Sequence, residues 1–438
     1  MLDLKALRRD PDAARTALSR RGGDDGAILD HVLELDERRR AILPELEALR
    51  AEQNAANQGI ARAQKAAKDG SGSQEDADAA IATMREVAGR AKALQEELAH
   101  VETTLQQTQA RLPNLPHPAS PPQDAVLKTV GEPRIDGLGL RAALPGTPPA
   151  APQDHLALAG ERVDMERGAR LSGSRFAYLR GELVFLELAL VQWTLSKLRD
   201  HGHEAVLPPV LVREEALYGT GFLPDTEQQI YALPDDELYL AGTSEVALAS
   251  LHADEILEGG TLPRRYAGFS PCFRREAGAA GRDTRGIFRV HQFDKVEMFS
   301  FVAPEDAEAE HDRLLALEEE ILTELGIPYR VVDIAVDDLG ASAARKFDCE
   351  AWLPSQEQYR ELTSTSNTTD YQARRLGARY RPEGGKPDAL ATLNGTAVAV
   401  GRTIIALLEH GQREDGSVVL PPCLVPFGAP AVLAPAAA

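Results

Sequence analysis

Cysteine is scarce in this sequence. Only three are present among 438 residues, Cys272, Cys349 and Cys423, and no two stand close together. A disulfide-stapled fold and a zinc site of the CxxC type both need clustered cysteines, so neither is indicated and no zinc is expected. The 43% of hydrophobic residues is enough to build a packed core instead.

Basic residues are in deficit, because 48 Lys and Arg face 68 Asp and Glu and give a net charge of -20. That is the wrong sign for a protein that coats nucleic acid nonspecifically, so any RNA contact must come from a local basic patch. Long apolar runs are also missing, since no stretch reaches the roughly 18 residues of a membrane span. The N-terminal MLDLKALRRDPDAA has no apolar signal core, and a cytoplasmic protein is therefore expected.

Two glycine signatures of nucleotide-binding proteins are missing as well. No GxGxxG and no GxxxxGK[ST] opens a helix, which makes dinucleotide-fold and P-loop interpretations poor. The length of 438 residues exceeds that of one compact domain and predicts two domains or three.

Heptad spacing dominates the N-terminal quarter. Apolar residues recur every seven positions over 28–63, and a second series over 32–67 is offset by four. The pattern breaks at a Gly- and Ser-rich turn, 68–75, and resumes over 84–112. Two heptad helices joined by a short turn must lie antiparallel, and helices of about 40 residues would each reach roughly 60 Å. On the heptads alone, a dimerisation or spacer hairpin is the favoured interpretation.

Charge distinguishes this hairpin from the rest of the chain. Residues 1–112 hold 17 Lys and Arg against 20 Asp and Glu, a net of -3, which leaves -17 of the total -20 elsewhere. Cations gather toward the turn, and they are Arg62, Lys65, Lys68, Arg85, Arg90 and Lys92. A partner with phosphates would suit them, although a solvated helix face would look similar.

Proline ends the hairpin and helps to define the domains. The stretch 113–122 cannot continue a helix, so we place a helical arm at 1–112 and a proline-rich linker and lead-in at 113–167. Within the lead-in, 144–152 is interpreted as a surface loop. The main domain is placed at 168–427, and the Ala- and Pro-rich tail 428–438 is predicted to be disordered.

The main domain is predicted to be α+β. Helices are expected at 177–200, 245–256, 305–325 and 397–410. Short β-like runs with brief connections are expected at 205–212, 229–233, 237–241, 265–275, 287–301, 330–334, 347–352, 359–363 and 389–393. Consecutive strands with helices inserted between groups favour a mainly antiparallel sheet flanked by helices.

The densest group of chemically useful residues lies in 271–298, which is interpreted as two strands joined by a Gly- and Arg-rich loop. Period two would place Arg274 and Glu276 on one face of the first strand, and Arg289, Phe293 and Glu297 on one face of the second. Arginine suits phosphate, an aromatic ring stacks on a base, and a carboxylate accepts from an amine. For any single residue a solvated face with ion pairs is the simpler interpretation. The set together favours a site for an anionic, aromatic, amine-bearing ligand.

The same segment carries a family resemblance. Phe273-Arg-Arg-Glu-Ala-Gly278 followed by Val290-His-Gln-Phe-Asp-Lys-Val-Glu297 resembles motif 2 of the class II aminoacyl-tRNA synthetases, and of the seryl type in particular. Further segments in the same order resemble that family over nearly the whole chain, namely Val206–Val210 with Leu217–Gly221 (motif 1), Thr243–Glu245, Tyr359–Asn367, Gln372–Arg375, and Thr392–Thr396 with Ala399–Thr403 (motif 3). The heptad arm is similar to the family's tRNA-binding hairpin.

The resemblance implies an ATP-dependent ligase for serine, with ATP as substrate, Mg²⁺ as its metal, and serine tRNA and selenocysteine tRNA as partners. It also implies a homodimer, built on motif 1. The implied ATP-binding residues are Arg274, Arg275, Glu276, Arg289, Val290, Phe293, Glu361, Leu362, Thr363, Ser364 and Arg402. The implied serine-binding residues are Thr243, Ser244, Glu245, Arg274, Glu297, Asn394 and Thr396.

Individual roles also follow from the resemblance. Arg274 would hold the α-phosphate, Glu276 the adenine amino group and Arg289 the outer phosphates, with adenine between Phe293 and Arg402. Glu297 would meet the serine ammonium and Thr396 its hydroxyl. Arg274, Glu361 and Arg402 would be catalytic, and Glu361 and Ser364 would bind the magnesium. Strand alternation, however, turns Arg275 away from the others.

Three alternatives stay open. The first is a related synthetase of the threonyl or prolyl type, of which the threonyl type would need a zinc-binding Cys/His set that the sequence lacks. An amino-acid:carrier-protein ligase would be expected to lack the arm. A catalytically inactive paralogue that binds RNA or acts as a scaffold would usually have lost Arg274, Glu276 or Arg402, all of which are present.

Overall fold

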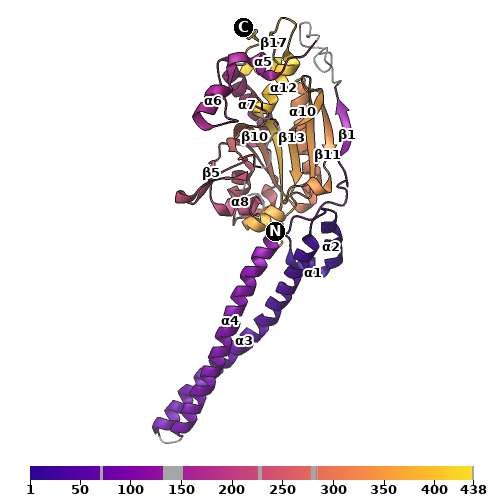
Figure 1. Ribbon diagram of the computed structural model, residues 1–438. Helices are drawn as coiled ribbons and strands as arrows, with labels where there is room; N and C mark the ends of the chain where they lie inside the picture. The colour runs from indigo at the N-terminus through magenta and orange to yellow at the C-terminus, as the bar shows by residue number, and fades with distance from the viewer. Residues whose placement is uncertain (70–72, 132–150, 225–228, 278–282, 284, 437–438) are drawn as a thin grey trace. The chain divides into compact units, whose positions relative to one another are not determined.

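The computed structural model describes residues 1–69, 73–131, 151–224, 229–277, 283 and 285–436 (Figure 1). The chain divides into two compact units. One, here called the arm, contains residues 2–19 and 23–112, and the other, here called the body, contains residue 1, residues 20–22 and residues 113–438.

The arm is built from four helices: α1 (Leu4–Arg9), α2 (Pro11–Ser19), α3 (Asp25–Asp69) and α4 (Gln74–Ala110). The two long helices, α3 and α4, pack along each other, as the heptads predict (Figure 1). Their shared seam buries Leu46 and Leu49 of α3 against Val87 and Ala91 of α4. The helical hairpin is therefore confirmed.

The seam departs from strict heptads near the start of α3. Leu29 is buried there, whereas Ile28 is only half-buried. Asp36 is fully buried, because its carboxylate accepts hydrogen bonds from Arg8 of α1 at 2.7 Å and from Arg39 at 3.0 Å. Two guanidiniums thus balance the charge of this buried acid.

The body is built on an eight-stranded sheet of order β1-β11-β12-β13-β16-β10-β9-β4. Only the edge pair β4–β9 is parallel, and the other pairs of this sheet are antiparallel. The strands are β1 (Ala125–Val130), β4 (Glu204–Val206), β9 (Arg264–Phe273), β10 (Gln292–Val302), β11 (Tyr329–Asp333), β12 (Arg345–Leu353), β13 (Gln358–Asn367) and β16 (Ala391–Ala399). The predicted α+β class with a mainly antiparallel sheet is confirmed.

Helices and small sheets complete the body (Figure 1). The helices are α5 (His155–Ala159), α6 (Met165–Ser172), α7 (Glu182–Asp200), α8 (Glu214–Thr220), α9 (Glu245–Ala249), α10 (Ala307–Glu324), α11 (Tyr371–Leu376) and α12 (Val400–Gly411). The small sheets contain β2 (Val163–Asp164), β3 (Tyr178–Leu179), β5 (Leu211–Val212), β6 (Tyr231–Leu233), β7 (Leu238–Leu240), β8 (Ile256–Glu258), β14 (Arg379–Arg381), β15 (Asp388–Ala389), β17 (Val418–Val419) and β18 (Val432–Leu433). Among the described residues, no helix combines the length and the apolar character needed to cross a membrane.

The two faces of the sheet serve different purposes. Along β10, Val296 and Met298 are buried in the main core, to which α7, α10 and α12 also contribute. The alternate residues Phe293, Lys295 and Glu297 line a cavity instead. Side chains of a strand alternate between the faces of a sheet, so one strand supplies both the core and the cavity.

Three expectations need correction. The prediction of a disordered tail is wrong for residues 428–436, because β18 pairs with β17 and buries Leu433. The lead-in 113–167 is more than a linker, since β1 joins the main sheet and α5 packs on α12. The strand expected at 287–301 begins only at Gln292. Most of the proline-rich 144–152, and residues 278–282 and 284 of the Gly- and Arg-rich loop, lie outside the described residues.

Candidate functional site

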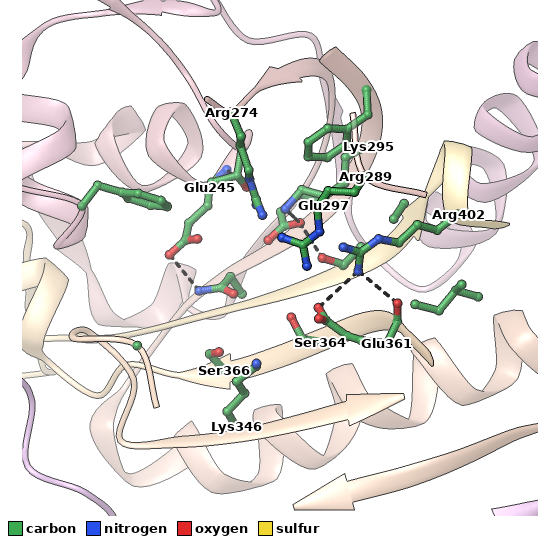
Figure 2. A pocket seen from close by; sticks show the side chains of 18 of the residues that line it. Glu245, Arg274, Arg289, Lys295, Glu297, Lys346, Glu361, Ser364, Ser366 and Arg402 are labelled. Carbon is green, nitrogen blue, oxygen red and sulfur yellow. Dashed lines mark hydrogen bonds and ion pairs between the residues drawn. The ribbon is translucent and has the colours of Figure 1, made fainter. Parts of the chain in front are cut away.

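A cavity of about 380 Å³ opens on the face of the sheet opposite the main core (Figure 2). Its walls come from β10, β13, β16, the start of α12 and the segments that flank β9 and β10. The residues expected at the site that line it are Thr243, Glu245, Arg274, Glu276, Arg289, Val290, Phe293, Glu297, Glu361, Leu362, Ser364, Asn394, Thr396 and Arg402.

Three expected residues do not line the cavity. Arg275 is exposed, as strand alternation suggested. Ser244 is buried and shares a 2.8 Å hydrogen bond with the hydroxyl of Ser270. Thr363 points into the sheet–helix interface, where its hydroxyl donates to the Glu318 carboxylate at 2.9 Å. The side chains of Ser244 and Thr363 therefore support the cavity from behind.

Three arginines line the cavity, with Arg402 beside Glu361 and Arg274 between Glu361 and Glu245 (Figure 2). The Nε of Arg274 donates to the carbonyl of Gly242 at 3.1 Å, and its guanidinium lies 5.3 Å from the centre of the Phe293 ring. Arg289 donates through Nη1 to Glu276 at 2.8 Å. These contacts hold two guanidiniums in place before any phosphate arrives (Figure 2).

Arg402 and Glu361 form a second charged pair in the cavity, after Arg289 and Glu276. Nη1 of Arg402 donates to the Glu361 carbonyl at 3.0 Å and lies 3.6 Å from its carboxylate. Burial raises the pKa of Glu361, but Arg402 and Lys346 outweigh it and hold the pKa below its usual range. Burial lowers the pKa of Arg402, opposed by the charge of Glu361. The Glu361 carboxylate is therefore ionised at neutral pH.

Glu245 lies toward the other end of the cavity, away from Arg402 and Glu361 (Figure 2). Glu245 accepts hydrogen bonds from the side-chain amides of Gln372 at 2.8 Å and Asn394 at 2.9 Å. Burial, reinforced by the charge of Glu297, raises the pKa of Glu245 to about 7. Glu297 pairs with Lys295 at 2.6 Å and accepts from the hydroxyl of Thr396 at 3.2 Å. Paired carboxylates beside hydroxyl and amide groups suit a small molecule that carries an ammonium and a hydroxyl.

The residues expected to bind magnesium fit that ion in their chemistry. Glu361 and Ser364 both line the cavity and both offer oxygen, the donor atom that Mg²⁺ prefers. Within the described part of the chain, no group of three or more His, Cys, Asp and Glu is placed to hold a metal alone. Mg²⁺ usually keeps several waters and binds phosphates beside one or two protein ligands, so a partial set suits a metal that accompanies a nucleotide.

Sequence reasoning missed several lining residues. Lys295 lies on β10 between Phe293 and Glu297, and the period-two rule applied to these two would have found it. Lys346 reaches the cavity from β12 and pairs with Asp348 at 3.2 Å. Thr220, Gly221 and Ser366 also line the cavity, and they lie in segments that carry the family resemblance without having been expected at the site. Other lining residues come from segments with no local signal, and they include Phe222, Gly340, Ala341, Ser342 and Ala343.

The arm carries the cations that the sequence singled out. All six are exposed, on α3 or α4, and they are Arg62, Lys65, Lys68, Arg85, Arg90 and Lys92. Lys92 lies 3.8 Å from Glu96 one turn along α4. Exposed cations on a long helical hairpin can meet a polyanion without a large desolvation cost.

Comparison with known proteins covers both units. Residues 1–116 match the seryl-tRNA synthetase N-terminal domain, and residues 231–411 match the tRNA synthetase class II core domain (G, H, P, S and T). The chain is 50% identical over 447 residues to a protein named serine--tRNA ligase from Nocardia farcinica, with both chains fully covered.

Solved structures give the same result. A seryl-tRNA synthetase from Pyrococcus horikoshii complexed with ATP superposes with a TM-score of 0.90 at 38% identity, and both chains are fully covered. A cytoplasmic serine-tRNA ligase from Naegleria fowleri in complex with AMP superposes with a TM-score of 0.84 at 29% identity, over 99% of each chain.

Proposed function

The chain belongs to the seryl-tRNA synthetase family, and from that membership we propose that it activates L-serine with ATP and transfers it to serine tRNA. One observation carries the proposal beyond the family name. A single cavity is lined by three guanidiniums, those of Arg274, Arg289 and Arg402, and by the carboxylates of Glu245 and Glu297 together with the hydroxyl of Thr396. These are the groups needed to hold a nucleotide triphosphate beside a hydroxylated amino acid.

In the first step, a carboxylate oxygen of serine bonds to the α-phosphorus of ATP while the bond from that phosphorus to the bridging oxygen breaks. Pyrophosphate leaves with the electron pair, and seryl-adenylate remains. Negative charge builds on the phosphoryl oxygens during this exchange, so Arg274 stabilises the transition state. Arg289 binds the outer phosphates. No protein nucleophile is required.

Magnesium fits the phosphate end of the cavity. Glu361 and Ser364 would hold it there, and when bound it would neutralise phosphate charge and orient the phosphates. Arg402, whose guanidinium contacts Glu361, would keep that carboxylate ionised and pointed toward the ion. Adenine would lie beside Phe293, with Val290 and Glu276 near its edge.

Serine would be selected at the carboxylate end. Its ammonium would lie between Glu245 and Glu297, and its hydroxyl would bond to Thr396. Alanine lacks the hydroxyl and would leave its buried partner, Thr396, without that hydrogen bond. A site built to bind a hydroxyl rejects such an analogue strongly. In the second step a ribose hydroxyl of the terminal adenosine of tRNA attacks the carbonyl carbon of seryl-adenylate, and AMP leaves.

The proposal is tested by ATP–pyrophosphate exchange with a panel of amino acids. Serine should support exchange, and alanine, threonine and glycine should support far less. Exchange with another amino acid would contradict the serine assignment. No exchange with any amino acid, in the presence of magnesium, would favour an inactive paralogue.

The raised pKa of Glu245 predicts a pH dependence for serine. Because the pKa of Glu245 is about 7, its carboxyl is mostly neutral below pH 7. A neutral carboxyl attracts the ammonium of serine only weakly. The KM for serine is expected to rise up to about tenfold per pH unit below that pKa and to level off above it. Measurement of KM from pH 6 to 8.5 checks this.

A glutamine at position 245 provides the control for this prediction. The Glu245→Gln variant should have a higher KM for serine that no longer changes with pH over the same range. A wild-type KM that stays flat between pH 6 and 8.5 would show that Glu245 does not meet the ammonium in its ionised form.

Dimerisation is proposed on the basis of an exposed apolar surface. On α7, Phe185 is 60% exposed and Leu188 is 56% exposed, and Leu207 after β4 is 78% exposed. Large apolar side chains are seldom left in water in such groups unless a partner covers them. Motif 1, which includes Leu207, builds the dimer interface in the family that the chain resembles. A second copy of this chain would therefore cover α7 and the β4 edge.

Sedimentation velocity checks this surface. The double variant Phe185→Glu, Leu188→Glu is expected to shift the protein from dimer to monomer at micromolar concentration, because each new carboxylate would lose its hydration in the interface. Leu127→Glu is the matched control, because Leu127 is 52% exposed on β1, at the opposite edge of the same sheet. Equal sedimentation of all three proteins would contradict the proposed interface.

Two finer assignments rest on the same proposal. Selenocysteine tRNA is proposed as a second acceptor, and charging of that RNA with serine in vitro tests it. The cytoplasm is proposed as its location, because the proposed reaction supplies translation.

A further inference from the structure

The loop that leads into β10 bears the phosphate-binding side of the cavity, yet it has no regular secondary structure. Residues 285–291 precede β10 without strand pairing, and they carry Phe288, Arg289 and Val290 into the cavity. Backbone groups in such a segment need partners other than a neighbouring strand. What fixes this loop therefore fixes Arg289.

A buried histidine from a distant segment supplies one partner. The backbone N–H of Ile287 donates to Nε2 of His155, the first residue of α5, at 3.3 Å. A β-carbon at Gly286 would collide with the same nitrogen, so glycine at that position lets the ring approach the loop. Next to His155, Asp154 pairs with Arg285 of the loop at 3.0 Å. Two consecutive residues thus hold the loop at Arg285 and Ile287, one on each side of Gly286.

The hydrogen bond from Ile287 sets the tautomer of the neutral His155 ring. Because Nε2 accepts, the neutral ring carries its proton on Nδ1, which lies 3.7 Å from the Glu409 carboxylate. Glu409, near the end of α12, is itself fixed by the backbone N–H of Ser355 at 3.0 Å and the Ser355 hydroxyl at 2.8 Å. At 3.7 Å the carboxylate forms no hydrogen bond with Nδ1, but its negative charge favours a proton on that nitrogen, and Nε2 is then left to accept.

The held loop also supports Arg402. Nε of Arg402 donates to the Phe288 carbonyl at 3.4 Å, and the guanidiniums of Arg360 and Arg402 lie 4.1 Å and 4.7 Å from the Phe288 ring. A shift of Ile287 would therefore displace two nucleotide-facing arginines, Arg289 and Arg402. The partners of Glu245 and Glu297 described above do not include any residue of this loop.

We propose that His155 is a positioning residue for ATP: its Nε2 holds the Ile287 N–H and thereby sets the loop that places Arg289 and Arg402 on the nucleotide. The inference rests on the proposed function only for the identity of the nucleotide. It assigns to α5, in a segment that the sequence placed in a linker, a part in building the nucleotide site.

Three substitutions separate the hydrogen bond from the shape of the ring. His155→Phe keeps a ring and removes the acceptor. His155→Gln places an amide oxygen at the reach of Nε2, and His155→Asn places its amide at the reach of Nδ1 and leaves Ile287 without a partner. We expect KM and Kd for ATP to rise about tenfold or more in the Phe and Asn variants, because a buried N–H loses its acceptor. The Gln variant should recover to within about threefold of wild type.

The KM for serine should stay within about twofold in all three variants. His410→Phe is the matched control, because His410 is also buried, on α12, and its Nε2 contacts the Trp352 carbonyl at 2.8 Å, away from the loop. It should change thermal stability without a selective change for ATP.

Calorimetric ATP binding keeps the outcomes distinct. Wild type that binds ATP but exchanges no pyrophosphate would contradict the proposed function, while the order of ATP Kd among the variants would still test the inference. Equal ATP Kd in all variants, a Gln variant as weak as the Asn variant, or an equal rise in serine KM would overturn it. If the Phe variant does not fold, the Gln and Asn pair decides.

Discussion

Replacement of Arg274 by alanine is expected to reduce serine-dependent ATP–pyrophosphate exchange on the order of 10²–10³-fold, since loss of one preorganised donor to a developing anion costs about that much. Arg274 is held by Gly242 and by the Phe293 ring, so its charge is already in position at the phosphate end of the cavity. The loss should fall mainly on kcat, because the charge that Arg274 meets grows in the transition state. Steady-state exchange kinetics measure it.

The neighbouring arginine provides a matched control. Arg275 is exposed and does not line the cavity, although it belongs to the same sequence motif. Arg275→Ala should retain exchange within about twofold, because its charge is screened by solvent. If both variants lost activity equally, the side-chain directions around the end of β9 would be wrong. If neither did, Arg274 would not be catalytic.

Removal of the arm is expected to separate the two steps of the reaction. A variant in which a short Gly/Ser linker replaces residues 30–108 should keep serine-dependent exchange within about threefold, because every residue that lines the cavity belongs to the body. Its charging of serine tRNA at low RNA concentration should fall on the order of 10²-fold or more, because many phosphate contacts would be lost together. Exchange and aminoacylation assays on the same preparation measure both. Charging that persisted would contradict a tRNA-binding role for the arm.

A milder change tests the cations themselves. Glutamine at Arg62, Lys65, Lys68, Arg85, Arg90 and Lys92 should weaken tRNA binding and flatten its dependence on salt, because fewer counterions are released. Arg38→Gln is the control, since Arg38 donates to Glu97 across the hairpin at 2.7 Å and lies far along α3 from the turn. An unchanged salt dependence in the six-residue variant would remove these cations from the interface.

The arm could be predicted well because its signal is local. Heptad spacing is a property of consecutive residues, and the two long helices follow it except at Leu29 and Asp36 in α3 and at Gln109 and Ala110 in α4, which are buried outside the predicted series. Asp36 enters the seam because Arg8, from a separate helix, neutralises it. No periodicity within α3 carries that information.

The site was found for a reason that is only partly right. Arg274 and Glu276 were assigned to a strand face, but β9 ends at Phe273 and Glu276 has a positive φ of 51°. Both side chains reach the cavity from irregular backbone. The strand expected from Ile287 fails similarly, because the N–H of Ile287 bonds to His155, 132 residues earlier in the chain. Partners that distant leave no trace in local alternation.

In the C-terminal tail, the prediction missed regular structure that the chain forms. Its Ala- and Pro-rich composition predicted disorder, yet β18 pairs with β17 and Leu433 is buried. Two strand residues with a suitable partner suffice to order a short segment, and composition cannot reveal the partner. The family resemblance supplied the residue types of the site. Lys295 and Lys346, which no expectation included, came only from the structure.

The position of β10 between β9 and β16 limits which changes in its length this chain can tolerate. Val296 and Met298 of β10 face the core, and Lys295 and Glu297, which alternate with them, face the cavity. Hydrogen bonds to a neighbouring strand hold β10 along both edges. Insertion or deletion of one residue in β10 would turn its charged side chains into the core and its apolar side chains into the cavity. A protein with such a change is expected to lose solubility and activity together. β10 can therefore tolerate substitutions far better than a change in its length.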